Sequence, residues 1–105
     1  MTKEQFFKNL NVPTTKIDAV LDTDTYNEID DQFALAYMLR STEKINLKAI
    51  YAAPFLNEKS ASAKDGMVKS YSEILKILDL ADKSELAVNT LKGSEMYLPD
   101  EKTPV

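Results

Sequence analysis

Apolar residues gather in short runs that predict strands. Residues 17–21 are apolar apart from Asp18 and partly β-branched, which is typical of a strand buried on both faces of a parallel sheet. In residues 45–53, apolar and polar residues alternate at first, and the run then becomes wholly apolar until Pro54 ends it. A third, shorter strand is expected at residues 86–88, and mostly loop from residue 89 onward.

Three further stretches predict helices. Residues 4–10 suit a short helix that Pro13 ends. A second helix begins near Ile29 or Asp30 and extends to about Arg40; its middle is apolar almost all round, as in a helix buried on more than one side. A third covers residues 64–80, with apolar residues at helical spacing. Core positions are expected at Phe33, Tyr37 and Met38 in the second helix, and at Met67, Tyr71, Ile74, Leu75 and Leu78 in the third.

The order β-α-β-α-β predicts an α/β fold: a Rossmann-like open parallel sheet with flanking helices, formed by residues 1–105 as a single domain. Three parallel strands leave edges that natural proteins usually cover or pair. We therefore expect the domain to be incomplete and the chain to self-associate, as a dimer.

Charge and composition narrow the classes of function. A net charge of −4 argues against a sequence-independent nucleic-acid binder, which needs a basic face. The chain has no cysteine and no histidine, so thiolate sites and His-activated nucleophiles are excluded. The charged N-terminus is no signal peptide, and no apolar run is long enough for a membrane span. The expected location is the cytoplasm.

The most informative stretch is acidic: five of the ten residues from Asp22 to Asp31 are Asp or Glu. Asp22 and Asp24 follow the first strand, two residues apart. Asp30 and Asp31 fall in the first turn of the next helix, where the helix dipole favours negative charge. We expect the loop to bring all four aspartates to one crevice at the carboxyl end of a strand, the edge where open α/β sheets bind ligands.

Four neighbouring carboxylates repel one another, so they must take up protons or share a cation. A ligand set made only of oxygen suits calcium or magnesium. The stretch is not an EF-hand, because it lacks the glycine of the sharp turn. The alternative is a solvated acidic loop in which Asp30 caps the helix.

These motifs carry a family resemblance. Asp22-Thr23-Asp24, followed after a short loop by Asp30-Asp31 and an apolar helix, resembles the signature of the inosine-uridine-preferring nucleoside hydrolases. That family's pattern has a tight Pro-Gly turn between the two acidic pairs, whereas residues 25–29 form a longer loop without either residue. Weaker similarity continues in residues 48–55, at Asn57, and in residues 93–105.

The resemblance implies the N-terminal part of a nucleoside hydrolase fold. It also implies calcium-dependent hydrolysis of the N-glycosidic bond of a ribonucleoside substrate, giving base and ribose. It assigns Asp24 and Asp31 as calcium ligands, Asp30 as the general base acting on metal-bound water, Asp22 as a support for these ligands, and Asn57 as a neighbour of the ribose. Because the loop is longer than the family's turn, we expect Tyr26, Asn27 or Glu28 to enter the pocket and alter the choice of substrate.

Simpler interpretations remain: Tyr26 as partial packing, and Asn57 as the cap of a turn. For the whole chain, the alternative to an enzyme is a truncated, non-catalytic α/β module that self-associates or only binds a metal. A phosphatase with a DxD nucleophile is disfavoured, because no phosphate cradle is present and Asp30-Asp31 is left unexplained. Members of the resembling family are several times longer, and their remaining ligands and leaving-group acids lie further along. We therefore expect little or no activity from these 105 residues alone.

Overall fold

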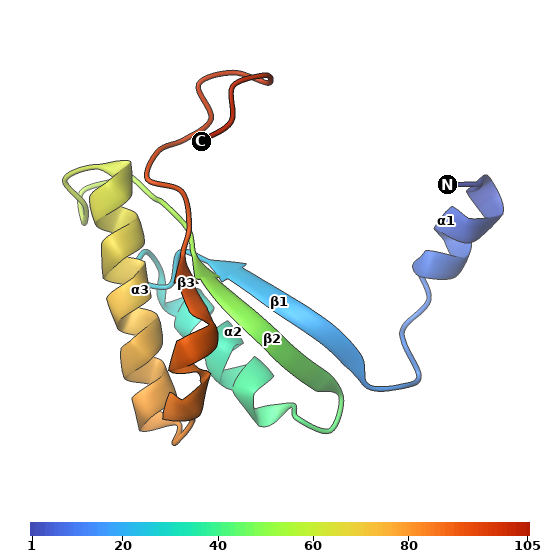
Figure 1. Cartoon of the computed structure of the whole chain (residues 1–105). Coiled ribbons are helices and arrows are strands. Elements are labelled where there is room, and N and C mark those ends of the chain that lie inside the picture. Colours follow the sequence, from blue (N-terminus) through green and yellow to red (C-terminus); the bar gives the residue numbers. More distant parts are fainter.

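The computed structural model describes residues 1–105 and contains one three-stranded parallel sheet in the order β1-β2-β3 (Figure 1). The elements of the body are β1 (Ile17–Thr23), α2 (Ile29–Arg40), β2 (Ile45–Ala52), α3 (Ala63–Leu80), the 3-10 helix η1 (Ser84–Asn89) and β3 (Thr90–Lys92). The predicted α/β fold with an open parallel sheet is therefore confirmed. The outer strands β1 and β3 each keep one unpaired edge.

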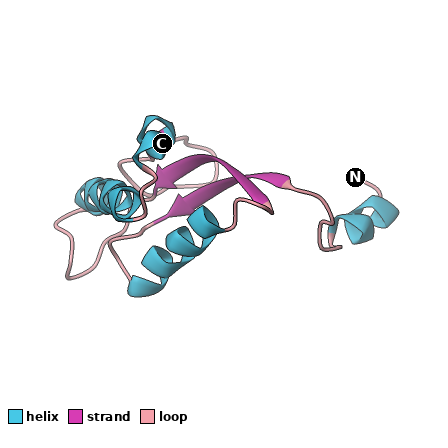
Figure 2. Ribbon diagram, turned by 90° about the horizontal axis from the view of Figure 1, so that it is seen from below, coloured by secondary structure: helices cyan, strands magenta, loops and turns pink.

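Both α2 and α3 pack on the same face of the sheet. Ile50 and Ala52, two residues apart on β2, point to one face and belong to the same buried cluster as Leu35 of α2 and Met67 of α3. Figure 2 shows α2 along one side of the strands. The face toward the helices is thus the core of the molecule, with Leu39, Ile74, Ile77 and Leu78 completing the cluster.

The opposite face of the sheet is open to solvent, so the prediction that β1 is buried on both faces is wrong. Val20 is 57% exposed, although it is apolar and lies in mid-strand. Beside it, Asp18 accepts a hydrogen bond of 2.7 Å from Asn46 and pairs with Lys48 at 3.8 Å, both on β2. The apolar composition of β1 alone did not reveal that no element covers this side.

The prediction that α2 is buried on several sides is also wrong. Only Leu35 and Leu39 are buried, whereas Phe33 is 69% and Tyr37 76% exposed. Met38 is half-buried. The physical reason is that α2 packs against the sheet and α3 along one stripe, and nothing covers its other side.

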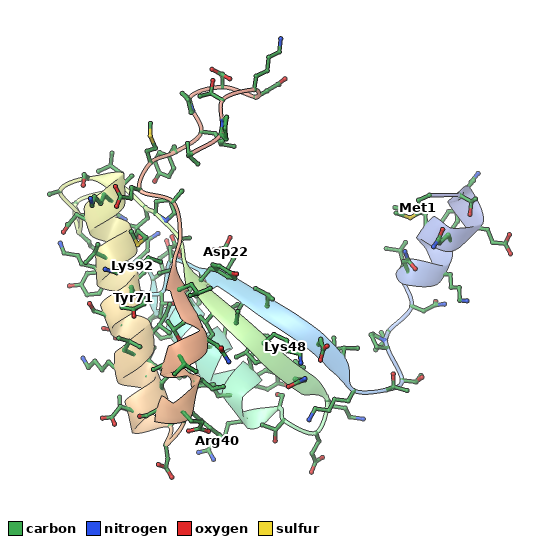
Figure 3. All side chains as sticks on the ribbon, viewed as in Figure 1. Met1, Asp22, Arg40, Lys48, Tyr71 and Lys92 are labelled. Atoms are coloured by element: carbon green, nitrogen blue, oxygen red, sulfur yellow. The ribbon has the colours of Figure 1, made fainter.

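The predicted strand at residues 86–88 is wrong, because this segment forms η1. A strand would point Leu86 and Val88 to the same side, but Leu86 packs against the core and Val88 is exposed. The Thr90 hydroxyl donates to the Leu86 carbonyl at 3.1 Å. β3 begins at Thr90, inside the segment expected to be loop. Figure 3 shows Lys92 of β3 beside Tyr71 of α3, with its Nζ 5.2 Å from the ring centroid.

The first helix, α1 (Lys3–Asn9), confirms the short helix predicted over residues 4–10. Its N-cap is Thr2, whose side chain accepts a hydrogen bond from the Gln5 amide at 3.1 Å. Every residue from Met1 to Asp18 is exposed, and Figure 1 shows α1 held away from the body on an extended segment. No helix of the structure has the length and apolar character needed to span a membrane.

Candidate functional site

Two buried threonines form the floor of the acidic stretch. Thr23 is the last residue of β1, and its hydroxyl lies 2.9 Å from both the Thr25 hydroxyl and the Asp31 Oδ1. A hydroxyl has one proton to give, and a carboxylate can only accept. Thr23 therefore donates to Asp31, and Thr25 donates to Thr23. The strand end is in this way tied to the first turn of α2.

A second chain of hydrogen bonds joins Asp24 to the loop after β2. The Asn27 side-chain amide donates to Asp24 Oδ2 at 2.8 Å, and the Asn57 amide donates to Asn27 Oδ1 at 2.6 Å. Asn57 Oδ1 accepts from the Lys59 backbone amide at 2.9 Å, and the Lys59 ammonium donates to the Asn27 carbonyl. Asp24, Asn27 and Asn57 are thus neighbours, as expected for residues at the carboxyl ends of adjacent parallel strands.

Asp24 and Asp31 bring their carboxyl groups within hydrogen-bonding reach of each other. Burial raises the pKa of Asp31, and both the hydrogen bond with Asp24 and the charge of that residue raise the pKa further. The charge of Asp30 acts in the same direction, whereas the hydrogen bond from Thr23 lowers the pKa. A proton on Asp31, or a cation beside it, would relieve this repulsion.

The other two aspartates stand apart from this pair. Asp22, labelled in Figure 3, is exposed and lies in register with Tyr51 of β2. β1 ends at Thr23, and the chain turns over residues 24–27, where the Asn27 backbone amide donates to the Asp24 carbonyl at 2.7 Å. Asp30 is exposed in the first turn of α2. No group of three acidic side chains is close enough to hold one ion. The expected convergence of four aspartates is therefore reduced to two.

The capping alternative also fails in detail, since the N-cap of α2 is Glu28 and its side chain makes no capping bond. Asp30 lies inside the helix, where it adds charge without capping.

Tyr26 packs against the start of α3. Its ring stacks on Phe55, with centroids 6.4 Å apart and planes at 24°, and the Lys69 ammonium lies 5.9 Å from the ring centroid. Its backbone amide donates to the buried Ser70 hydroxyl at 3.2 Å. The side chain nevertheless stays 40% exposed beside the loop that carries Asn27.

Sequence reasoning missed three contributors: Thr23, Thr25 and Lys59. The available signal was the alternation Asp-Thr-Asp-Thr at the end of a strand, because a threonine between two acidic residues can donate to a carboxylate. Nothing in the sequence pointed to Lys59, whose partner Asn27 is far away along the chain.

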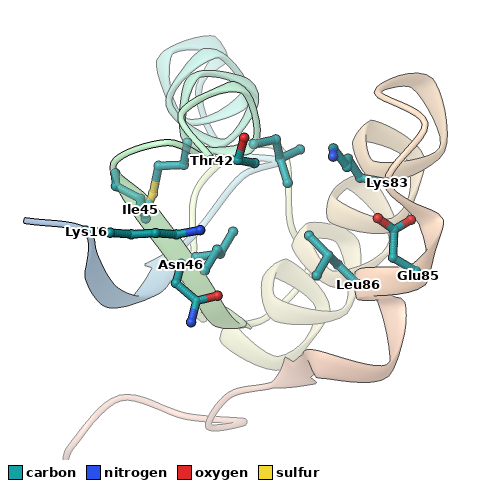
Figure 4. Close-up of a pocket in the computed structure, with 10 residues that line it drawn as sticks. Lys16, Thr42, Ile45, Asn46, Lys83, Glu85 and Leu86 are labelled. Atoms are coloured by element: carbon teal, nitrogen blue, oxygen red, sulfur yellow. The ribbon is translucent and has the colours of Figure 1, made fainter.

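The hollows of the molecule lie away from the acidic pair. Figure 4 shows a pocket of about 190 Å³ lined by Lys16, Ile45, Asn46 and Leu86, at the amino ends of β1 and β2. This is the edge opposite to the acidic pair. Neither Asp24 nor Asp31 lines this pocket or any of the other hollows of the molecule. The carboxyl edge is the candidate site because polar side chains converge there. No family model, curated protein or solved structure matches the chain.

Proposed function

We propose that this chain carries the cation-binding corner of a calcium-dependent nucleoside hydrolase. The observation that supports this most is the close Asp24–Asp31 carboxyl pair at the carboxyl edge of a parallel sheet. Thr23 donates a hydrogen bond to Asp31, and Asn27 donates one to Asp24. The donors are all oxygen, which suits a hard cation. The resemblance of the Asp22–Asp31 stretch to that family supplies the reaction.

In this proposal Asp24 and Asp31 hold the ion. Asp30, exposed one residue away, accepts a proton from the attacking water. Bound calcium would supply positive charge that acidifies water and orients ribose hydroxyls. Asn27 and Asn57, hydrogen-bonded to each other, would bind those hydroxyls, and the carboxylates would stabilise the oxocarbenium-like transition state of ribosyl cleavage.

Two carboxylates are far fewer than the about six to eight oxygens that calcium takes in proteins. We therefore expect weak calcium binding and little release of free ribose from inosine or uridine by this chain alone. Asp22 lies on the open face of the sheet, so it can support the ion only through its charge.

The test is NMR titration of the labelled chain with calcium, then with a cationic imino sugar that mimics the oxocarbenium ion. We expect millimolar calcium to shift the amides of residues 24–31, and the imino sugar to shift those of Asn27 and Asn57 only when calcium is present. Asp24→Asn with Asp31→Asn should abolish both responses, whereas Asp18→Asn, an exposed acid on the same strand, should leave them unchanged.

The second candidate is a non-catalytic module that binds a metal only, and the convergence of two aspartates instead of four favours it. Calcium shifts without any response to the imino sugar would select this function over the hydrolase. Absence of calcium shifts in the native chain would overturn both.

A further inference from the structure

A stripe of exposed apolar side chains runs along the outer side of α2. Ile29, Phe33 and Tyr37 follow one another at four-residue spacing, so they share one helical face, and all three are mostly exposed. We call them the α2 stripe. Beside it, Ile77, Leu80 and Ala81 complete a groove of about 340 Å³ between α2 and the end of α3. Exposed apolar faces of this kind mark sites of association.

The same molecule contains a helix, α1, that packs against no other element. α1 has seven residues, and helices shorter than about 12 residues are marginal in water unless they pack on something. Phe6, Phe7 and Leu10 are at least half exposed, and the two rings pack edge to face with their centroids 5.6 Å apart. Docking of α1 in an apolar groove would bury these three side chains and stabilise the helix.

The charges of the two parts are complementary. Residues 1–16, which we call the arm, hold three of the 13 basic residues and one of the 17 acidic ones. The body, residues 17–105, is left with ten basic and sixteen acidic residues. Glu28 and Asp30, both exposed, lie at the start of the α2 stripe. Lys3 and Lys8 flank the aromatic residues of the arm, so a docked arm would bring basic groups toward an acidic rim.

We propose that the arm of one copy docks in the groove beside the α2 stripe of a second copy, and that the second arm returns the contact. The structure favours exchange between copies because the arm extends away from its own helices (Figure 1). A two-fold exchange uses both arms and both grooves, so it closes as a dimer and does not propagate. It requires neither calcium nor the hydrolysis proposed above, so the two proposals can fail separately.

The chain has no cysteine, which allows a clean cross-linking test. A chain with Phe7→Cys is mixed with a mass-tagged chain carrying Phe33→Cys, and the mixed disulfide is measured under mild oxidation. The matched control replaces the second variant by Val88→Cys, another exposed apolar residue far from the groove. We expect the mixed dimer to form at least several-fold faster with Phe33→Cys than with Val88→Cys. Equal rates would overturn the proposal.

A chain carrying both Phe7→Cys and Phe33→Cys separates exchange from folding back. Exchange gives disulfide-linked dimers, whereas an arm docked on its own body gives a cross-linked monomer, and that product would contradict the proposal.

Sedimentation equilibrium supplies the second measurement. We expect the native chain to be dimeric at about 100 μM, and Phe33→Ser with Tyr37→Ser to be monomeric with an unchanged circular dichroism spectrum, since both side chains are exposed. Val88→Ser should remain dimeric. A native chain that stays monomeric, or a stripe variant that stays dimeric, would overturn the proposal.

Discussion

Thr23 has more influence on the acidic pair than its size suggests. Its hydroxyl is buried and donates to Asp31, which stabilises the ionised carboxylate against the effects of burial and of Asp24. The same hydroxyl is the acceptor for Thr25. One atom therefore lowers the pKa of Asp31 and also holds the Thr25 side chain of the following loop.

Replacing Thr23 by Val keeps the shape but removes this hydroxyl. We expect the pKa of Asp31 to rise further, because the only hydrogen bond that lowers it is lost. The buried Thr25 hydroxyl also loses its acceptor, at a cost of about 1–3 kcal/mol in the free energy of unfolding. Carboxyl NMR titration and urea unfolding measure the two effects. Thr103→Val, at an exposed threonine, should change neither; an unshifted Asp31 would contradict the prediction.

Asp31 also predicts how stability depends on pH. Its pKa is raised in the folded chain, chiefly by burial, so the folded state binds a proton more tightly than the unfolded state. The stabilisation is complete below the ordinary value of 3.8 and is lost as pH rises through the higher folded value. Urea unfolding across this range should show a loss for the native chain that Asp31→Asn lacks. Calcium should reduce the loss, because a cation replaces the proton.

Asp65 serves as a control, because folding lowers its pKa whereas folding raises that of Asp31. Hydrogen bonds from Lys69 and from the Ala61 amide lower the pKa of Asp65, so its contribution is present above the ordinary value and is lost as pH falls. Asp65→Asn should therefore flatten the acid side of the profile. A profile in which Asp31→Asn and Asp65→Asn act in the same direction would contradict both assignments.

One tight contact between elements joins the start of α3 to the loop after β2. Gly66 lies inside α3, where helix propensity alone favours alanine by about 1 kcal/mol. A Cβ at this position would come within 2.1 Å of the Phe55 carbonyl oxygen. The glycine that seems to weaken the first turn of the helix is what allows this loop, and with it Asn57, to approach the site.

Gly66→Ala should therefore destabilise the fold by about 1–3 kcal/mol, since overpacking outweighs the gain in propensity. The control is Ser72→Ala on the exposed side of the same helix, which should change stability by less than about 0.5 kcal/mol. Urea unfolding of both variants measures these changes in stability. A Gly66→Ala chain more stable than the native one would contradict the prediction and show that the loop at Phe55 can move to admit the methyl group.

Periodicity predicted the main elements well but not what they face. It gave α2 and α3 nearly to the residue, because helical spacing is a local property. It failed for Phe33 and Tyr37, because an apolar side chain favours burial but does not show that another element covers it. For the site, the acidic stretch predicted that four aspartates converge, and only Asp24 and Asp31 do so. The separation of Asp22 depends on where β1 ends, which no local pattern fixes.

At the scale of the whole molecule, stability is unevenly distributed. Only 14 of the 105 residues are buried, and the core lies almost wholly between α2, α3 and β2. The arm contributes nothing to it, since each of its residues is exposed. The chain therefore consists of a small cooperative body and a segment that gains order only by docking.

Amide hydrogen exchange should display this division. We expect the slowest exchange at Ile50 and Ala52 in β2 and near-unprotected exchange in α1 when the chain is dilute, because opening costs least where no core contact is broken. Raising the concentration should protect α1, as the exchanged arms dock, but not the exposed segment near Val105. Strong protection of α1 in dilute solution would contradict this expectation.

The parallel sheet has one more consequence, for the order in which the chain folds. No two strands are joined by a hairpin: β1 reaches β2 only after α2 is laid down, and β2 reaches β3 only after α3. Loop closure must therefore precede every strand pairing, which slows folding relative to a helical bundle of equal size. The helices are expected to form first, and the Asp24–Asp31 pair, which needs β1 seated, is among the last features to appear during refolding.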